Sequence, residues 1–220
     1  FVSKHNLELG KKLGLAKKEN LVYNGIEKSV LNFYTRQEAR GELGVNREND
    51  FVVGSIGRLA YAKNYEFLIN IFPEVLKVKS NARLVIIGDG PNRQEYEKII
   101  QEQGLHDKII LLGSIDYAFR YIEAFDLFIL PSRYEGLSIT LIETLFSGVP
   151  VLATDVGGNR ETLPSDQEIY QLDNKKEFLD KFQKLTSQES REKISRHNLE
   201  HSKSFTLDKT IQGYQEIYEQ

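Results

Sequence analysis

Six short apolar runs, rich in β-branched residues, recur along this 220-residue chain and constrain its fold more than any other feature. Runs such as LVIIG and LFILP are apolar at every position, as in strands that are buried on both faces of a parallel sheet. Helical periodicity fills the stretches between them, so the pattern predicts an α/β fold with a doubly wound parallel sheet of about six strands. The predicted strands are Phe51–Ile56, Arg83–Ile87, Lys108–Leu112, Asp126–Leu130, Val149–Ala153 and, more weakly, Glu168–Leu172.

Three helices are predicted between these strands, over Tyr65–Lys79, Asn92–Gln103 and Leu137–Ser147. Each repeats apolar residues at helical spacing, and Gly104 and Gly148 stand where the second and third helices should stop. The ends of the chain hold the remaining predicted elements: a helix over Lys4–Leu13, a short strand over Asn20–Tyr23, a polar helix over Thr35–Leu43, and two or three helices within 174–220.

The composition is that of a single globular domain and excludes several classes of function. A net charge of −3 gives no electrostatic reason to expect nucleic acid as a partner. The chain contains no Cys, which excludes disulfides and thiolate metal sites. No apolar stretch approaches the ~20 residues that cross a bilayer. The first residue is Phe1 rather than Met, so we expect the chain to have been cut from something longer.

Two cations lie in one glycine-initiated loop, GRLAYAKN (57–64), between the first predicted strand and the next helix. Backbone N–H groups and the helix dipole favour an anion at such a position. The planar Arg58 guanidinium can grip phosphate oxygens, and the Lys63 ammonium adds a mobile charge. On spacing alone, a solvated loop with two surface cations explains these residues equally well.

Glycine-containing turns follow the next two predicted strands, at the edge where such sheets bind ligands. The turn Gly88-Asp89-Gly90 lets a ligand approach the backbone closely, and Ser114-Ile115 ends the following strand in a similar way. Taken alone, both segments are better explained as ordinary strand-to-helix turns.

The segment PSRYEGLSITLIE (131–143), after the fourth strand, is richer in chemical groups. Glu135 lies in the loop, and Gly136 exposes free N–H groups at the start of the next helix. Glu143 follows eight residues later among apolar neighbours, where a carboxylate is costly unless it is hydrogen-bonded. Sugar or ribose hydroxyls are suitable partners for it, and pairing with a nearby Lys or Arg is the alternative.

These pieces in this order resemble the family-four retaining glycosyltransferases, which have the GT-B architecture. The resemblance implies that the chain is the C-terminal, donor-binding half of a GT-B fold, a Rossmann-like domain. Residues 1–50 would then connect from an absent N-terminal acceptor domain, residues 51–203 would bind the nucleotide sugar, and residues 204–220 would form a helix that crosses back. The matching segments are GRLAYAKN (57–64), IGDGP (87–91), GLHDKIILLGSI (104–115) and DLFILPSRYEGLSITLIETLFSGVPVLATDVGGNRE (126–161).

The same resemblance implies roles for individual residues. Arg58 and Lys63 would bind the donor's diphosphate, Glu135 would contact hydroxyls of the transferred hexose, and we expect these three residues to be catalytic. Glu143 would hold the ribose hydroxyls. The other expected donor contacts are loop or backbone positions: Gly57, Gly88, Asp89, Gly90, Ser114, Ile115, Gly136, Leu137, Ser138 and Ile139.

The implied function is retaining transfer of a hexose from a UDP- or GDP-linked sugar to a saccharide or lipid-linked acceptor in surface polysaccharide synthesis. Fixed cations would stabilise the negative charge that grows on the leaving diphosphate. No cofactor or metal is expected, because Asp-x-Asp is absent and the four histidines form no ligand pattern. The isolated chain is expected to be inactive, since the acceptor would bind through the absent domain.

Expectations about location and two alternative functions complete this interpretation. The implied location is the cytoplasm, at the inner face of the membrane, where Lys11-Lys12 and Lys17-Lys18 leave a peripheral membrane contact open. A starch or glycogen synthase relative and a non-catalytic nucleotide-sugar-binding or interaction module remain as alternatives. The Glu135–Glu143 spacing disfavours a nucleotide-sugar epimerase.

Overall fold

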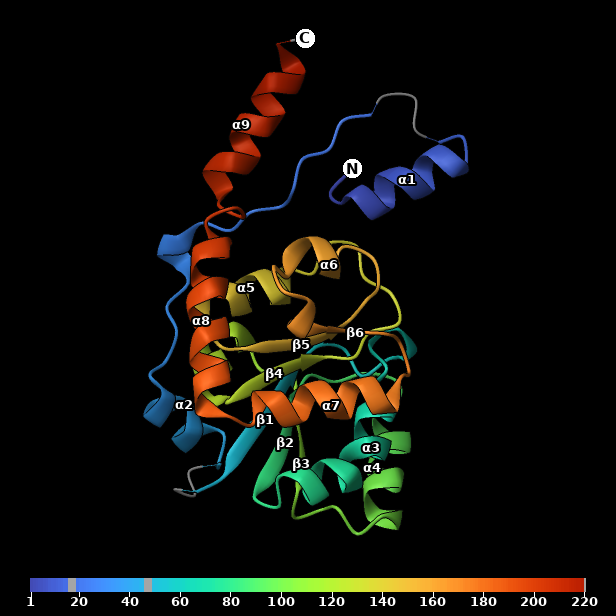
Figure 1. Cartoon of the computed structure of the whole chain (residues 1–220), viewed down its shortest axis with the longest axis vertical. Coiled ribbons are helices and arrows are strands. Elements are labelled where there is room, and N and C mark those ends of the chain that lie inside the picture. Colours follow the sequence, from blue (N-terminus) through green and yellow to red (C-terminus); the bar gives the residue numbers. More distant parts are fainter. Residues whose placement is uncertain (16–18, 46–48, 220) are drawn as a thin grey trace.

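The computed structural model describes residues 1–15, 19–45 and 49–219, which are arranged around one parallel sheet (Figure 1). The strand order is β3-β2-β1-β4-β5-β6, and every neighbouring pair is parallel. This is a doubly wound order, whose direction of winding reverses between β1 and β4, so the predicted fold class is confirmed. The strands are β1 (Phe51–Ile56), β2 (Ala82–Ile87), β3 (Ile109–Gly113), β4 (Leu127–Leu130), β5 (Val151–Thr154) and β6 (Ile169–Tyr170).

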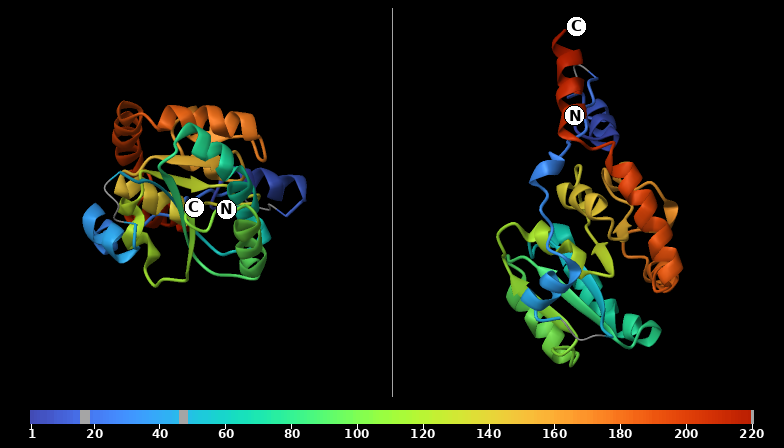
Figure 2. Two further views of the ribbon diagram at one scale, coloured as in Figure 1. Left: turned by 90° about the horizontal axis from the view of Figure 1, so that it is seen from below. Right: turned by 90° about the vertical axis from the view of Figure 1, so that its left-hand side faces the viewer.

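Helices cover both faces of the sheet, as Figure 2 shows. The α-helices are α1 (Lys4–Lys12), α2 (Arg36–Glu42), α3 (Tyr65–Val78), α4 (Arg93–Glu102), α5 (Ile139–Ser147), α6 (Asn159–Thr162), α7 (Lys175–Leu185), α8 (Gln188–Ser202) and α9 (Leu207–Tyr218). The 3-10 helices are η1 (Lys28–Val30), η2 (Tyr61–Lys63), η3 (Ala118–Ala124) and η4 (Asp166–Glu168).

Two hydrophobic clusters, one on each face, hold the layers together. Side chains of α3, α4 and α7 pack on one face, and those of α2, α5 and η3 pack on the other. Along β1 the side chains alternate between the clusters, with Phe51 and Val53 in the first and Val52 in the second. Each such residue contributes about 1.5–3 kcal/mol when it is fully buried, which is why the continuous apolar runs predicted the sheet so directly.

The N-terminal part of the chain departs from one prediction. The strand expected over Asn20–Tyr23 is wrong, because this segment has no neighbouring strand with which to form a ladder. Its main chain instead makes isolated hydrogen bonds, such as the one that Val22 N donates to Phe1 O at 3.0 Å. Lys11 of the expected basic pairs is bound to Glu19 at 2.9 Å, whereas Lys17 and Lys18 lie outside the described residues.

The helix α9 projects from the body beside the extended segment 22–26 (Figures 1 and 2). The Thr210 hydroxyl donates to Tyr23 O at 2.9 Å, and Ile26 N donates to Phe205 O at 2.9 Å. By contrast, Ala39 of α2 is fully buried in a core cluster. The division at residues 50 and 203 stays a prediction.

No helix in the described part of the chain has both the length and the apolar composition needed to cross a membrane.

The buried Glu168 should make the stability of the fold depend on pH. Burial raises the pKa of Glu168 to about 8, although Asn198 Nδ2 donates to Oε1 of its carboxyl at 2.7 Å. The folded state therefore binds a proton that the unfolded state has lost, and the free energy of unfolding should fall by about 2–4 kcal/mol as the pH rises from about 4.5 to 8.

Urea unfolding at several pH values checks this expectation. Glu168→Gln should make the fall in stability between pH 5 and 8 clearly shallower, because the amide does not titrate. The control Glu102→Gln changes a carboxylate whose side chain is 62% exposed on α4 and should keep the wild-type slope. Equal slopes in the wild type and Glu168→Gln would contradict the assignment.

Candidate functional site

The loops that follow β1 and β4 meet at the carboxyl edge of the sheet, where the winding reverses. Arg133 N donates to Ala62 O at 2.7 Å, which ties the two loops together. Beside this contact Lys63 Nζ lies 2.6 Å from Glu135 Oε1, and the Ser132 hydroxyl donates to the same oxygen at 2.6 Å. Two of the predicted catalytic residues, which are 72 positions apart in the sequence, therefore form a half-buried ion pair.

Gly57 leaves the room in which the Lys63 side chain reaches Glu135. A Cβ atom at residue 57 would lie 3.3 Å from Lys63 Cε and 2.8 Å from the Tyr65 hydroxyl oxygen. Tyr65 is fully buried, and its hydroxyl lies 3.3 Å from the Ser55 hydroxyl, so it cannot easily give way. The glycine in the sequence thus serves the position of the cation, in addition to any approach of a ligand.

A hollow of about 400 Å³ opens at the carboxyl ends of β1, β2 and β3. Arg58 is exposed on its wall, and its guanidinium makes no hydrogen bond or ion pair with the other described residues. The hollow brings together most of the donor contacts predicted in the first three loops: Gly57, Arg58, Gly88, Asp89, Ser114 and Ile115.

Gly90 does not line this hollow but packs against the neighbouring loop. A Cβ atom at residue 90 would overlap the Leu59 carbonyl oxygen, and one at residue 88 would overlap that of Gly57. Hydrogen bonds of 3.0 Å from Leu59 N to Asp89 O and from Asn92 N to Leu59 O hold the two loops in this contact. The glycine pair therefore brings two loops together, and the role of Gly90 as a donor contact stays a prediction.

The N-terminus of α5 presents unpaired backbone donors beside Glu135. Helix α5 begins at Ile139, two residues later than predicted, because Ser138 is its N-cap and accepts from Leu141 N at 3.4 Å. Leu137 is buried, with a side chain in the core. The backbone N–H groups of Gly136, Leu137 and Ser138 donate to no described residue. The expected set of amides around residues 136–139 is therefore free to bind a ligand.

The Glu143 side chain lines neither of the two hollows at the carboxyl edge of the sheet, the one at Arg58 and the one at Glu135. It lies half-buried on α5, and its carboxylate has no hydrogen-bond partner among the described residues. Burial raises the pKa of Glu143 to about 7. Desolvation without compensation is unusual for a carboxyl group and marks this side chain as a candidate for function.

A second hollow, of about 620 Å³, lies on the other side of the Lys63–Glu135 pair. Its walls come from the loop that carries Glu135, from the loop after β5, and from α1, which contributes His5 and Asn6. No local pattern in the sequence predicted that α1 reaches this site. The contact depends on Glu161, which accepts hydrogen bonds from Lys4 N at 2.7 Å and His5 N at 3.0 Å.

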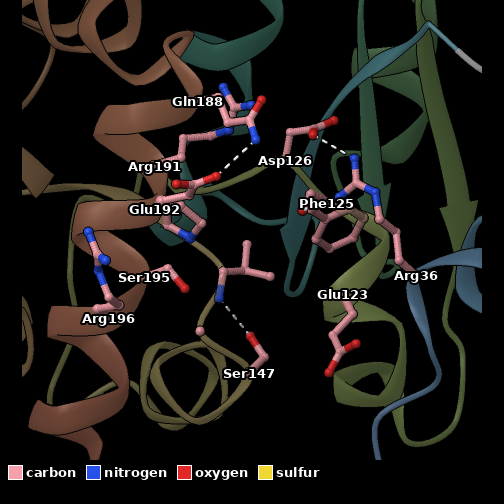
Figure 3. Close-up of a pocket in the computed structure, with 13 residues that line it drawn as sticks. Arg36, Glu123, Phe125, Asp126, Ser147, Gln188, Arg191, Glu192, Ser195 and Arg196 are labelled. Atoms are coloured by element: carbon pink, nitrogen blue, oxygen red, sulfur yellow. Dashed lines mark hydrogen bonds and ion pairs between the residues drawn. The ribbon is translucent and has the colours of Figure 1, made fainter.

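A further hollow, of about 740 Å³, lies at the opposite edge of the sheet (Figure 3). Its lining includes Asp126, which precedes β4, and Pro150, which precedes β5. Asp126 is bound by Arg36 and Arg40, each at 2.6 Å. We place the site at the carboxyl edge because the free amides and the unpaired guanidinium gather there.

No three His, Asp or Glu side chains come together as a possible metal site within residues 1–15, 19–45 and 49–219. The expectation of a metal-free site stays a prediction.

Solved structures place the fold among the GT-B glycosyltransferases. The Anabaena protein HepE, solved in complex with UDP-glucose, has a TM-score of 0.87 at 20% identity, covering 100% of this chain and 63% of that one. The family model for glycosyl transferases group 1 matches residues 36–201. The chain therefore belongs to the glycosyl transferases group 1 family.

Curated relatives agree with this family. An uncharacterized glycosyltransferase of Methanocaldococcus jannaschii is 32% identical over 152 residues, which cover 66% of this chain and 38% of that protein. The Campylobacter jejuni N-acetylgalactosamine-N,N'-diacetylbacillosaminyl-diphospho-undecaprenol 4-alpha-N-acetylgalactosaminyltransferase is 30% identical over 161 residues, covering 72% of this chain and 41% of that protein. The chain thus spans well under half the length of these two relatives.

The loop contact at Gly88 gives a prediction about the integrity of the site. Gly88→Ala should lower the free energy of unfolding by about 2–3 kcal/mol, because φ at this residue is +146° and a Cβ would overlap Gly57 O. The matched control Gly41→Ala, in α2 with nothing within 4 Å of the added atom, should instead raise it by about 0.5–1 kcal/mol. Thermal and urea unfolding measure both, and equal effects would show that the contact is not required.

Proposed function

We propose that this chain supplies the donor site for retaining transfer of a hexose from a nucleoside diphosphate sugar to a saccharide or lipid-linked acceptor. The observation that carries the proposal is the Lys63–Glu135 pair, which lies between two hollows at the reversal point of the sheet. Ligands of open α/β sheets bind at this point. The nucleoside would occupy the hollow at Arg58, and the hexose would lie at Glu135.

The charged groups of the site suit a diphosphate that leaves with growing negative charge. Arg58 has no internal partner, so its guanidinium is free to bind phosphate oxygens. Lys63 is already fixed by Glu135, and the free amides of residues 136–138 would donate to the same phosphate oxygens. Such preorganised donors stabilise a transition state without needing to reorient during the reaction.

In the proposed reaction the bond from the anomeric carbon to the diphosphate oxygen breaks, and a bond to the acceptor oxygen forms on the same face of the sugar. The departing phosphate oxygen takes the acceptor's proton, so no protein nucleophile is required. Glu135 and Glu143 do not act as an acid and nucleophile pair in the manner of glycoside hydrolases. Glu135 instead orients the hexose hydroxyls, and Glu143 would accept from the ribose hydroxyls.

The comparisons support a sugar nucleotide as the donor but do not identify its base or its sugar. The HepE structure contains UDP-glucose, so UDP-linked sugars are the first candidates and GDP-linked sugars the second. The Campylobacter relative is named for an undecaprenol-linked acceptor, which supports an acceptor of the polysaccharide or glycolipid type. We propose that the site works without a metal or other cofactor, and that it acts in the cytoplasm at the inner face of the membrane.

Calorimetry with UDP-glucose, GDP-mannose and ADP-glucose tests the donor site. One of these donors should bind, and Arg58→Ala and Lys63→Ala should each weaken its affinity by about tenfold, the effect of losing one charge-assisted hydrogen bond. The control Lys98→Ala removes a cation on α4 whose side chain is 75% exposed, and it should leave the affinity unchanged. Absence of binding to all three donors would favour an interaction module and reject the proposal.

The raised pKa of Glu143, about 7, gives the proposed site a pH dependence of defined sign. Ribose hydroxyls would donate to the ionised carboxylate, so affinity should be constant above pH 7.5 and fall by up to about tenfold per unit below pH 7. UDP-glucose is the appropriate ligand, because its diphosphate does not titrate in this range. Glu143→Gln should bind more weakly at pH 8 and lose the dependence, whereas an unchanged pH profile would show that Glu143 does not contact the donor.

A further inference from the structure

The hollow beside Glu135 has features that the donor site leaves unexplained. It shares Glu135 with the proposed hexose position but contains none of the residues that line the hollow at Arg58. A group bound in it would lie on the side of the hexose that faces away from the nucleoside. Its volume of about 620 Å³ is in the range of small-molecule sites.

An exposed aromatic residue forms one edge of this hollow. The side chain of Tyr134 is 61% exposed, as is that of Tyr61, whose ring centroid lies 6.2 Å away. The Arg133 guanidinium stacks 4.4 Å from the Tyr61 ring centroid and also donates to Tyr61 O at 3.1 Å, which fixes the base of the loop. Two large, solvent-exposed rings beside the hollow offer both an apolar face and hydroxyl groups to a ligand.

Helix α1 also lines the hollow, and hydrogen bonds hold its first turn in place. The Glu161 carboxylate holds the first N–H groups of α1, and the Tyr23 hydroxyl donates to the same carboxylate at 2.9 Å. A Cβ atom at Gly136 would lie 3.4 Å from Asn6 Nδ2, so α1 approaches the Glu135 loop to contact distance. His5 and Asn6 therefore line the hollow together with Tyr134.

Several charged side chains that line the hollow already have internal partners. Arg160 is bound in two places by Asp155, at 2.9 and 2.8 Å, and by Asp166 at 2.7 Å. Carboxylates of Glu135, Asp155 and Glu161 line the hollow together with the guanidinium groups of Arg133 and Arg160. Three carboxylates thus line the hollow with only two guanidinium groups, which disfavours a phosphate or an anionic lipid headgroup, whereas paired carboxylates and amides are suitable partners for neutral hydroxyls.

From this geometry we infer that the hollow between Tyr134 and α1 is a subsite for the sugar ring of the acceptor. The C–H face of a pyranose ring would pack on Tyr134, and its hydroxyls would bond to Asn6, His5 and the free face of Glu135. This inference rests on the proposed function, because it places the attacking hydroxyl next to the hexose at Glu135. It assigns acceptor recognition in part to this chain, in addition to any preceding domain.

Saturation-transfer NMR on the whole 220-residue chain tests this subsite. The probes are the methyl glycosides of glucose, galactose, mannose and N-acetylglucosamine, with UDP-glucose at saturation so that the donor position is filled. At least one O-methyl signal should show transfer from the protein. Tyr134→Ala should reduce that transfer about fivefold, whereas Tyr134→Phe should keep it, because the aromatic face is retained.

The control Tyr218→Ala removes a ring that is 86% exposed on α9 and should leave the transfer unchanged. No transfer to any methyl glycoside, equal transfer in Tyr134→Ala, or displacement of the glycoside by inorganic pyrophosphate would each overturn the subsite. Calorimetry of UDP-glucose on the same samples separates the two proposals. Binding of UDP-glucose without glycoside transfer rejects the subsite alone, whereas absence of binding to UDP-glucose, GDP-mannose and ADP-glucose alike rejects the proposed function.

Discussion

The parallel pairing of β1 with β4 determines where every chemically active group of this protein lies. Only Val53 with Leu127 and Gly54 with Phe128 pair directly across it, and a side chain at Gly54 would collide with the Phe125 ring. Because the winding of the sheet reverses at this pair, the helices after β1 and β4 leave toward opposite faces. The two loops diverge above the strand ends and leave a space that backbone and side chains from both can line.

Electrostatics at this junction is balanced before any ligand arrives. Lys63 and Glu135 neutralise each other in a partly buried setting, and Ser132 supplies a further hydrogen bond to the carboxylate. Removing either charge would leave the other buried without its partner, which is more costly than the pair itself. The same pairing holds the ammonium in place, so an incoming diphosphate meets an oriented cation whose counter-charge can turn to sugar hydroxyls.

The sequence predicted the sheet well, because strands buried on both faces are apolar at nearly every position. It also indicated Lys63 and Glu135, since both follow strands whose carboxyl ends share one edge of the sheet. The packing role of Gly90 could not be predicted, because a glycine indicates only that another group approaches closely, and here that group is the Leu59 backbone. The contribution of α1 was not predicted at all. It depends on a carboxylate about 155 residues away, and such a contact leaves no periodic trace in the sequence.

The bond between Glu161 and the first amides of α1 has a mechanical consequence. One carboxylate spans two segments from distant parts of the chain, and Ser3, directly ahead of α1, is fully buried beside Gly158. Short hydrogen bonds, and not deformable apolar packing, therefore set the distance between α1 and the loop at residues 133–135. The gap between them is therefore fixed in width, so a ligand that binds there is selected by its thickness and its shape.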